Sequence, residues 1–253
     1  MVNSLSGQTV VIVGGTSGIG YSVAKLALET TQANVVVASS NPSRVQKAKS
    51  SLQEIGGDRV KAYVLDLSNR DKLVENATAF FEKVGSLNHL VWTAGDSFSF
   101  MKIESFTRQE ADKVFNIRYW ALQECVRLAV PRMPASKESS ITFTSATIAE
   151  RPTPGWVLVG SGVSGALNSL ARGLAVDLAP VRVNCVAPGV VDTELWGWLE
   201  ENAKKGLFAE YAKKFPVGSV GRPDEVAEAY AFFMRCGYVS GQTVTVDGGS
   251  VLV

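Results

Sequence analysis

A glycine-rich stretch near the N-terminus has the residue types and the spacing of a phosphate-binding loop. An apolar run, Val10–Val13, leads directly into Gly14–Gly20, with the sequence GGTSGIG, and helical periodicity follows. Glycines allow a tight turn and a close approach to a pyrophosphate, while a helix start offers unpaired N–H groups and partial positive charge. The loop therefore predicts a dinucleotide site. The contacts expected from it are Gly14, Thr16, Ser17, Gly18, Ile19 and Gly20.

The segment after the second expected strand indicates which dinucleotide binds. An NAD pocket usually has an acidic residue there, which holds the ribose 2′-hydroxyl. Residues 39–44 read SSNPSR and contain no acid. Two hydroxyls, an amide and a guanidinium suit a 2′-phosphate, which a carboxylate would repel. We therefore predict NADP(H), bound through Ser39, Ser40, Asn41 and Arg44, although Arg44 would equally suit a solvated helix position.

Seven short apolar runs alternate with longer segments of helical period. The expected strands are Gln8–Val13, Asn34–Ser39, Val60–Leu65, His89–Trp92, Ser140–Thr144, Val181–Val186 and Thr243–Val246. Their apolar residues are continuous, which is typical of parallel strands covered on both faces. The expected helices include Ile19–Glu29, Pro42–Ile55, Asp71–Val84, Arg108–Val130, Ser161–Leu178 and Asp224–Arg235. The pattern predicts an α/β fold: a single Rossmann-type, doubly wound parallel sheet of about seven strands with helices on both faces, forming one domain over residues 1–253.

Residues 191–220 interrupt this alternation. They contain no strand-like run but are rich in large apolar side chains, namely Trp196, Trp198, Leu199, Phe208, Tyr211 and Phe215. An insertion beyond the carboxyl end of a strand is where a substrate lid lies in such folds. We predict an aromatic helical pair that acts as a lid; packing of these rings on the domain body or on a partner subunit is the alternative.

The bulk composition excludes several classes of function. The chain has a net charge of +1 and is 46% hydrophobic, which gives no sign of a nucleic-acid or membrane partner. The N-terminus lacks a signal peptide, and no apolar run reaches the roughly 18 residues that span a bilayer. Three well-separated cysteines (Cys125, Cys185 and Cys236) predict reduced, buried thiols and a cytoplasmic protein. No cluster has metal-ligand spacing, and His89 is interpreted as a packing residue.

With these motifs the chain resembles the short-chain dehydrogenase/reductase family over essentially its whole length. The Gly14–Gly20 loop is similar to the family's TGxxxGIG, and Thr93–Gly95 is similar to the end of its NNAG segment, with Trp92 in place of an asparagine. Residues 188–193, 222–227 and 241–249 also match. The resemblance implies further cofactor contacts at Asp66, Leu67, Ala94, Gly95, Asn116, Pro188, Gly189, Val190 and Thr193. It also implies a homotetramer or homodimer built on the fifth and sixth helices.

One family motif is missing from its expected place, the helix after the fifth strand. Members of the family carry Tyr-x-x-x-Lys, in which the lysine lowers the pKa of the tyrosine so that the tyrosine can pass a proton during hydride transfer. Counting back from Leu167–Leu178 places Gly160 at the tyrosine position and Ser164 at the lysine position, and neither can do that chemistry. The family's catalytic serine falls near Ser145 or Thr147, and the spacing does not decide between them.

Three functions remain open. The first is a reductase whose substrate needs no proton from a tyrosine, because an iminium ion becomes a neutral amine when it accepts hydride. The second is a domain that holds cofactor and substrate and performs a cyclisation or isomerisation by positioning alone. The third is a non-catalytic NADP-binding protein.

A narrower resemblance favours the first two. Residues 115–118 (FNIR) and 151–156 (RPTPGW) resemble a branch without the Tyr/Lys pair, which includes bifunctional reductase/Diels–Alderases of fungal indole-alkaloid pathways of the malbrancheamide and paraherquamide type. This resemblance implies NADPH reduction of a prenylated cyclic dipeptide iminium, followed by [4+2] closure. In that branch an arginine matching Arg118 and an aspartate near Trp156 act on the substrate; here Thr153 stands where the aspartate is expected.

The candidate catalytic residues are therefore Arg118, Ser145, Thr147 and Trp156. A guanidinium at Arg118 could bind a carbonyl or enolate oxygen, and the Trp156 ring could stack on an aromatic or polycyclic small-molecule substrate. A salt bridge for Arg118 and plain packing for Trp156 are the alternatives. Glu150, in the same loop as Trp156, is a candidate replacement acid.

Overall fold

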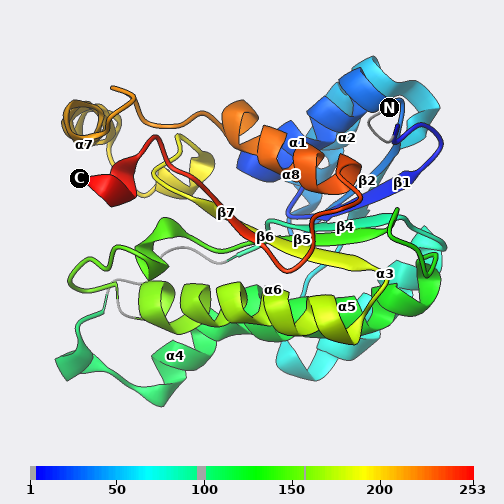
Figure 1. Ribbon diagram of the computed structural model, residues 1–253, viewed down its shortest axis with the longest axis horizontal. Helices are drawn as coiled ribbons and strands as arrows, with labels where there is room; N and C mark the ends of the chain where they lie inside the picture. Colours follow the sequence, from blue (N-terminus) through cyan, green and yellow to red (C-terminus); the bar gives the residue numbers. More distant parts are fainter. Residues whose placement is uncertain (1–3, 96–100, 157) are drawn as a thin grey trace.

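A twisted sheet of seven parallel strands forms the centre of the computed structural model, which describes residues 4–95, 101–156 and 158–253 (Figure 1). The strands pair in the order β3-β2-β1-β4-β5-β6-β7. Their bounds are β1 (Thr9–Val13), β2 (Asn34–Ser39), β3 (Val60–Val64), β4 (His89–Trp92), β5 (Ser140–Thr144), β6 (Arg182–Pro188) and β7 (Thr243–Val246). The order reverses direction at β1, as in a doubly wound sheet, and the predicted fold class is confirmed.

Helices cover both faces of the sheet (Figure 1). One layer consists of α1 (Gly18–Thr31), α2 (Pro42–Gly56) and α8 (Pro223–Arg235); the other consists of α3 (Leu73–Val84), α5 (Leu122–Ala129) and α6 (Gly165–Asp177). Each layer packs on the sheet through its own buried apolar cluster. The strands β4 and β6 are buried at every residue, as expected for parallel strands covered on both faces.

Two expected helices are interrupted by π-helical turns. The segment 108–130 divides into α4 (Arg108–Phe115), a π-helix (Asn116–Ala121) and α5, while a second π-helix (Leu158–Ser164) precedes α6. Apolar periodicity does not reveal the extra residue of a π-turn, because the flanking turns keep the same buried face. Such turns shift side chains relative to a regular helix and occur frequently at functional sites.

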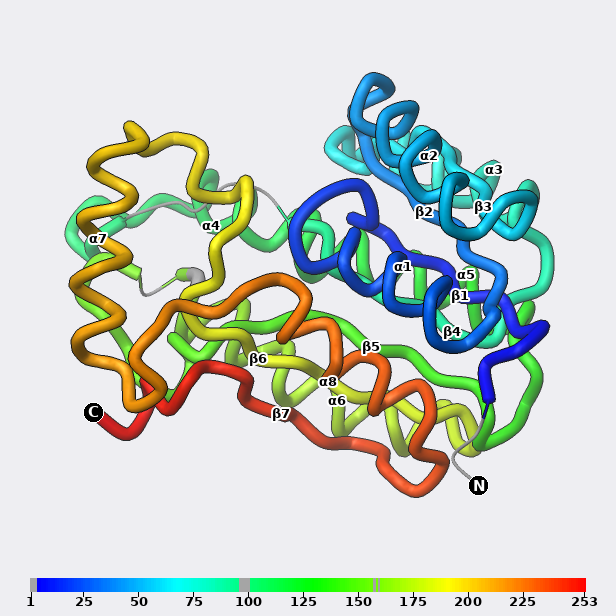
Figure 2. Tube along the Cα trace, turned by 90° about the horizontal axis from the view of Figure 1, so that it is seen from above, coloured from blue at the N-terminus to red at the C-terminus, as the bar shows by residue number. Residues whose placement is uncertain are grey.

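The strands are parallel, so all seven carboxyl ends lie along one edge of the sheet. The helix α7 (Glu201–Lys214) lies beyond this edge, and the C-terminus lies on the same side of the molecule (Figures 1 and 2). Residues 191–220 thus contain a short 3₁₀ turn (Glu194–Trp196) and a single α-helix, which corrects the expected helical pair. Within the described residues no helix is both long and apolar enough to cross a membrane.

Candidate cofactor and substrate site

A cleft of about 800 Å³ opens along the carboxyl edge of the sheet. It is lined by the turns that follow β1 to β6 and by the start of the segment that leads to α7. Most of the residues predicted to bind the cofactor line this cleft: Gly14, Thr16, Ser17, Gly18, Ile19, Gly20, Ser39, Ser40, Arg44, Asp66, Leu67, Ala94, Gly95, Pro188, Gly189 and Thr193. The topology therefore brings together turns that are far apart in the sequence, because parallel strands end at one edge.

The glycine loop forms a cradle that only backbone can line. Gly14 has a φ of +93°, and a methyl group built on it would lie 2.6 Å from the Ala94 nitrogen. A methyl group on Gly20 would collide with the Thr93 hydroxyl. Ser17, the N-cap of α1, makes no side-chain capping hydrogen bond, so the first N–H groups of the helix remain available. This geometry fits the pyrophosphate of a dinucleotide.

At the end of β2 the cleft is lined by Ser39, Ser40 and Arg44, and no carboxylate lies at this strand end. Asn41 does not line the cleft. Its side-chain oxygen accepts the backbone N–H of Arg44 at 2.9 Å and caps α2, which commits one face of the amide to the helix.

Asp66 shapes the turn after β3. Its carboxylate accepts the backbone N–H of Ser68 at 2.9 Å and the Ser68 hydroxyl at 2.7 Å, and these two bonds lower the pKa of Asp66 below its usual value. Asn116 donates its amide N–H to the Ser68 carbonyl at 3.0 Å and thereby stabilises the same turn. Asn116 does not line the cleft. Val190 also lies outside the lining; its carbonyl accepts the N–H of Gly221 at 3.0 Å.

Arg118 enters the cleft from the first π-helix and lies against the backbone of Gly95. A methyl group on Gly95 would lie 2.5 Å from the guanidinium carbon, so the arginine occupies the space that any side chain at position 95 would need. Arg118 therefore adds a cation to the cleft beside the turn after β4.

Ser145 and Thr147 differ in what their hydroxyls can do. The Thr147 hydroxyl donates to the Pro188 carbonyl at 3.2 Å, which ties its loop to the end of β6. Ser145 lines the cleft, but its hydroxyl oxygen is itself buried; it has no oxygen or nitrogen partner among the described residues and lies beside the Cys185 thiol. A buried hydroxyl without a partner is uncommon and fits a ligand-binding position. Ser145 is thus the better placed of the two to contact a substrate.

Gly160 and Ser164 lie on the second π-helix. A methyl group on Gly160 would lie 2.9 Å from the Ile148 carbonyl oxygen and 3.2 Å from an Ile148 side-chain carbon, so Ile148 fills the space that a side chain there would occupy. Ser164 is buried and lines the cleft. No basic residue replaces it on this turn, residues 158–164.

Three other candidates lie away from the cleft. Trp156 is partly buried against the hydrophobic core, and Glu150 accepts a hydrogen bond from the Thr245 hydroxyl at 3.2 Å. His89 is fully buried between Ser140 and Gln8, at 2.8 and 2.6 Å from its two ring nitrogens. Burial, followed by the charge of Arg182, lowers the pKa of His89 to about 3.

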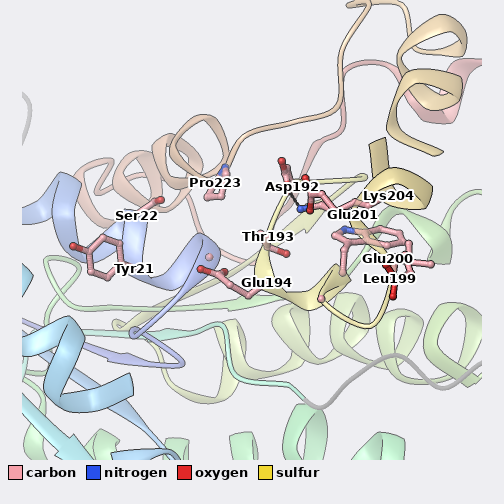
Figure 3. Close-up of a pocket in the computed structure, with 13 residues that line it drawn as sticks. Tyr21, Ser22, Asp192, Thr193, Glu194, Leu199, Glu200, Glu201, Lys204 and Pro223 are labelled. Carbon is pink, nitrogen blue, oxygen red and sulfur yellow. Dashed lines mark ion pairs between the residues drawn. The ribbon is translucent and has the colours of Figure 1, made fainter. Parts of the chain in front are cut away.

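The segment between β6 and α7 covers the cleft with aromatic side chains. Trp196 and Trp198 line it, with ring centres 6.5 Å apart, and Trp196 packs edge-on against Phe208 of α7. A second cavity of about 630 Å³ lies on the other side of this segment (Figure 3). Thr193, Glu194, Trp196 and Gly197 line part of both spaces, and Glu194 was not predicted from the sequence. The sequence gives one indication of a role for Glu194: it directly follows the family-like motif that ends at Thr193.

The cleft geometry can be compared with known proteins. A family model described as an SDR-like Rossmann domain matches residues 1–253. The chain belongs to the short-chain dehydrogenase/reductase family. The short-chain dehydrogenase/reductase ATR9 of Stachybotrys chlorohalonatus is 36% identical, over 98% of this chain and 99% of its own length. The MalC reductase/Diels-Alderase from Malbranchea aurantiaca is 34% identical, with a TM-score of 0.90 over 98% of both chains.

A third relative is described as having an atypical catalytic center. A short-chain oxidoreductase from Pseudomonas aeruginosa PAO1, with NADPH bound and an atypical catalytic center, is 27% identical, with a TM-score of 0.87 over 97% of both chains. The predicted family and the similarity to the fungal reductase/Diels–Alderases are thus confirmed. A reductase role within this family follows; the choice of cofactor and the substrate do not.

Proposed function

We propose that this protein is an NADPH-dependent reductase that adds hydride to the C=N carbon of a cyclic iminium, N-alkylated or formed by protonation of an imine, in an aromatic or polycyclic small molecule. The observation that carries the proposal is the second π-helix. Gly160, closed off by Ile148, and Ser164 are the residues that we assign to the positions of the family's proton-donating pair, and the glycine loop lines the cleft beside them.

The proton balance explains why such a site can work. Reduction of a ketone leaves an alkoxide, which must take a proton from the protein. Hydride addition to an iminium forms a C–H bond, and the C=N π electrons become the nitrogen lone pair, so the product amine is neutral without any proton. The bound cofactor supplies the hydride. The protein has only to bind and orient the substrate.

Arg118 and Ser145 provide the polar contacts for that orientation. A guanidinium repels a positively charged iminium, so Arg118 is expected to bind a carbonyl oxygen elsewhere in the substrate. The buried Ser145 hydroxyl offers a second hydrogen bond to such an oxygen. Trp196 and Trp198 supply flat apolar surface on the lid side of the cleft. We retain Trp156 and Thr147 as residues that support the site from outside its lining.

The preference for NADPH rests on the end of β2. Ser39, Ser40 and Arg44 line the cleft there without a carboxylate, which favours a 2′-phosphate over a free 2′-hydroxyl. We propose that residues 191–220 act as a substrate lid over this cleft and that the molecule is a homodimer or homotetramer.

A cyclisation after reduction is a second part of the proposal, supported by the similarity to the MalC reductase/Diels-Alderase. A [4+2] closure needs no proton transfer, only two reacting segments held face to face. Hydrogen bonding of a dienophile carbonyl to Arg118 would lower the barrier of such a step.

Paired substrates test the reductase. Oxidation of NADPH is followed at 340 nm with N-methyl-3,4-dihydroisoquinolinium and with α-tetralone, a ketone of similar size. We expect turnover of the iminium and none of the ketone. Equal rates on the ketone would refute the proposal. Cofactor binding without oxidation by any imine would favour the cyclase or the non-catalytic protein.

The role of Arg118 has a matched control. Arg118→Met should lower kcat/KM for a carbonyl-bearing imine by about 100-fold, the size of a charge-assisted hydrogen bond lost in a cleft. Arg127→Met, at an exposed arginine paired with Glu124 on α5, should leave it unchanged. A similar loss in both variants would point to damage to the helix and not to substrate binding.

A further inference from the structure

Glu194 lies at the junction of the cofactor cleft and the second cavity. It lines both spaces, and its side chain points toward the start of α1 (Figure 3). A methyl group built on Gly18, the first residue of α1, would lie 3.4 Å from a Glu194 carboxylate oxygen. A carboxylate oxygen therefore lies close to the helix end that the glycine loop offers to a phosphate.

The N-terminus of α1 attracts this carboxylate for a physical reason. Ser17 makes no side-chain capping bond, and the first turn of α1 contains no acidic residue. Unpaired N–H groups and the helix dipole favour an anion at this end. Among the described residues no salt bridge joins Glu194 to a basic side chain, so the helix end is its favourable electrostatic neighbour. A cofactor phosphate needs the same position, and two anions repel each other there.

The structure also provides a place for the carboxylate to go and a connection to the lid. The second cavity, of about 630 Å³, lies behind residues 193–197, and Lys204 of α7 lines it. Trp196 donates its indole N–H to the Val191 carbonyl at 2.9 Å and packs on Phe208 of α7. Lys204 forms an ion pair with Asp192 at 2.5 Å. A movement of Glu194 would therefore be passed to α7 through contacts on both sides of it.

We propose that Glu194 is a phosphate-displaced latch of the lid. Its carboxylate rests on the start of α1 in the free protein, leaves when a dinucleotide phosphate binds there, and moves into the second cavity, which releases residues 193–214. The inference rests on the nicotinamide dinucleotide of the proposed function, but it does not depend on the identity of the substrate.

The charge of Glu194 is tested by Glu194→Gln, with Glu200→Gln as the matched control. Glu200 is also exposed and lines the second cavity, but it does not line the cofactor cleft. The dissociation constant of NADPH is measured by quenching of tryptophan fluorescence. We expect Glu194→Gln to bind NADPH about 10-fold more tightly, which corresponds to about 1.4 kcal/mol and is reasonable for one repulsive charge at a solvated site. Glu200→Gln should stay within about twofold of the original protein.

Hydrogen exchange gives a readout independent of affinity and turnover. In the original protein, amides of residues 193–214 should exchange faster when NADPH is bound, and in Glu194→Gln they should exchange fast even without it. Unchanged or weaker NADPH binding by Glu194→Gln, or lid exchange that does not respond to the variant, would overturn the latch and leave the proposed function intact. Failure of the original protein to bind NADPH or NADH would overturn both.

Discussion

Replacement of Gly160 by alanine tests whether the tyrosine position of the family is closed in this protein. The added methyl group would lie 2.9 Å from the Ile148 carbonyl oxygen and 3.2 and 3.3 Å from its two side-chain γ carbons. The first distance is shorter than ordinary contact, and its partner is backbone, which does not move aside easily. Overpacking of this kind typically costs about 1–3 kcal/mol. We therefore expect Gly160→Ala to lower the free energy of unfolding by about that amount.

The control for this substitution is Gly173→Ala. Gly173 is exposed in α6, and no atom lies within 4 Å of a methyl group built there. Alanine in a helix interior is about 0.5–1 kcal/mol more favourable than glycine, so this variant should be more stable than the original protein. Urea unfolding followed by circular dichroism measures both free energies. Equal or greater stability of Gly160→Ala would refute the reasoning, because it would show that the space beside Ile148 is open.

The close approach of Ile148 to Gly160 also affects which reactions the site can catalyse. If Ile148 closes the tyrosine position, then the double variant Gly160→Tyr and Ser164→Lys should fail to gain ketone reduction, although it restores the family's motif in the sequence. Ile148→Ala added to that pair removes the side-chain part of the obstruction but leaves the carbonyl in place. The sequence motif alone is therefore not sufficient; the loop after β5 must also move.

Three further predictions follow from single groups. Arg44→Ala should weaken NADPH binding about 10-fold and leave NADH binding unchanged, by fluorescence titration, because only the 2′-phosphate loses a charged partner. Ser145→Ala should lower kcat for an imine substrate but change the free energy of unfolding by no more than about 0.5 kcal/mol relative to the original protein. The reason is that the Ser145 hydroxyl has no oxygen or nitrogen partner to lose. A large loss of stability would contradict this prediction. Burial lowers the pKa of His89 from 6.5 to about 3, so between these values the unfolded chain binds one more proton and stability falls as the pH falls. His89→Gln should remove up to about 1.4 kcal/mol per pH unit from that slope in urea unfolding between pH 6.5 and 4.5, and identical slopes would contradict the assignment.

The sequence predicted the fold because the signals that define it are local. The β-branched runs that became β2, β4, β5 and β7 end at the expected residues, and the glycine loop follows β1 directly. These elements depend on buried apolar runs and on turn chemistry, which neighbouring residues determine. The carboxyl-edge location of the cofactor residues then followed from parallel topology.

The structure decided what depends on contacts between distant segments. Ser145 and Thr147 are equivalent by spacing, but only Thr147 reaches the Pro188 carbonyl across the sheet edge. Asn41 has a side chain that suits a phosphate, but it caps α2 instead. The π-turn that places Arg118 against Gly95 leaves the apolar periodicity unchanged, so no pattern in the sequence announces it.

The sequence by itself therefore determined the α/β architecture, the glycine loop, the absence of an acid after β2, and a glycine and a serine at positions 160 and 164. Each of these is a matter of residue type at a given place in the chain. Only the tertiary structure decided that Ile148 fills the space beside Gly160, that the Ser145 hydroxyl is buried without an oxygen or nitrogen partner, and that Glu194 lies close to the start of α1. Those three facts depend on atoms brought together from separate strands and loops, and packing in three dimensions sets their distances.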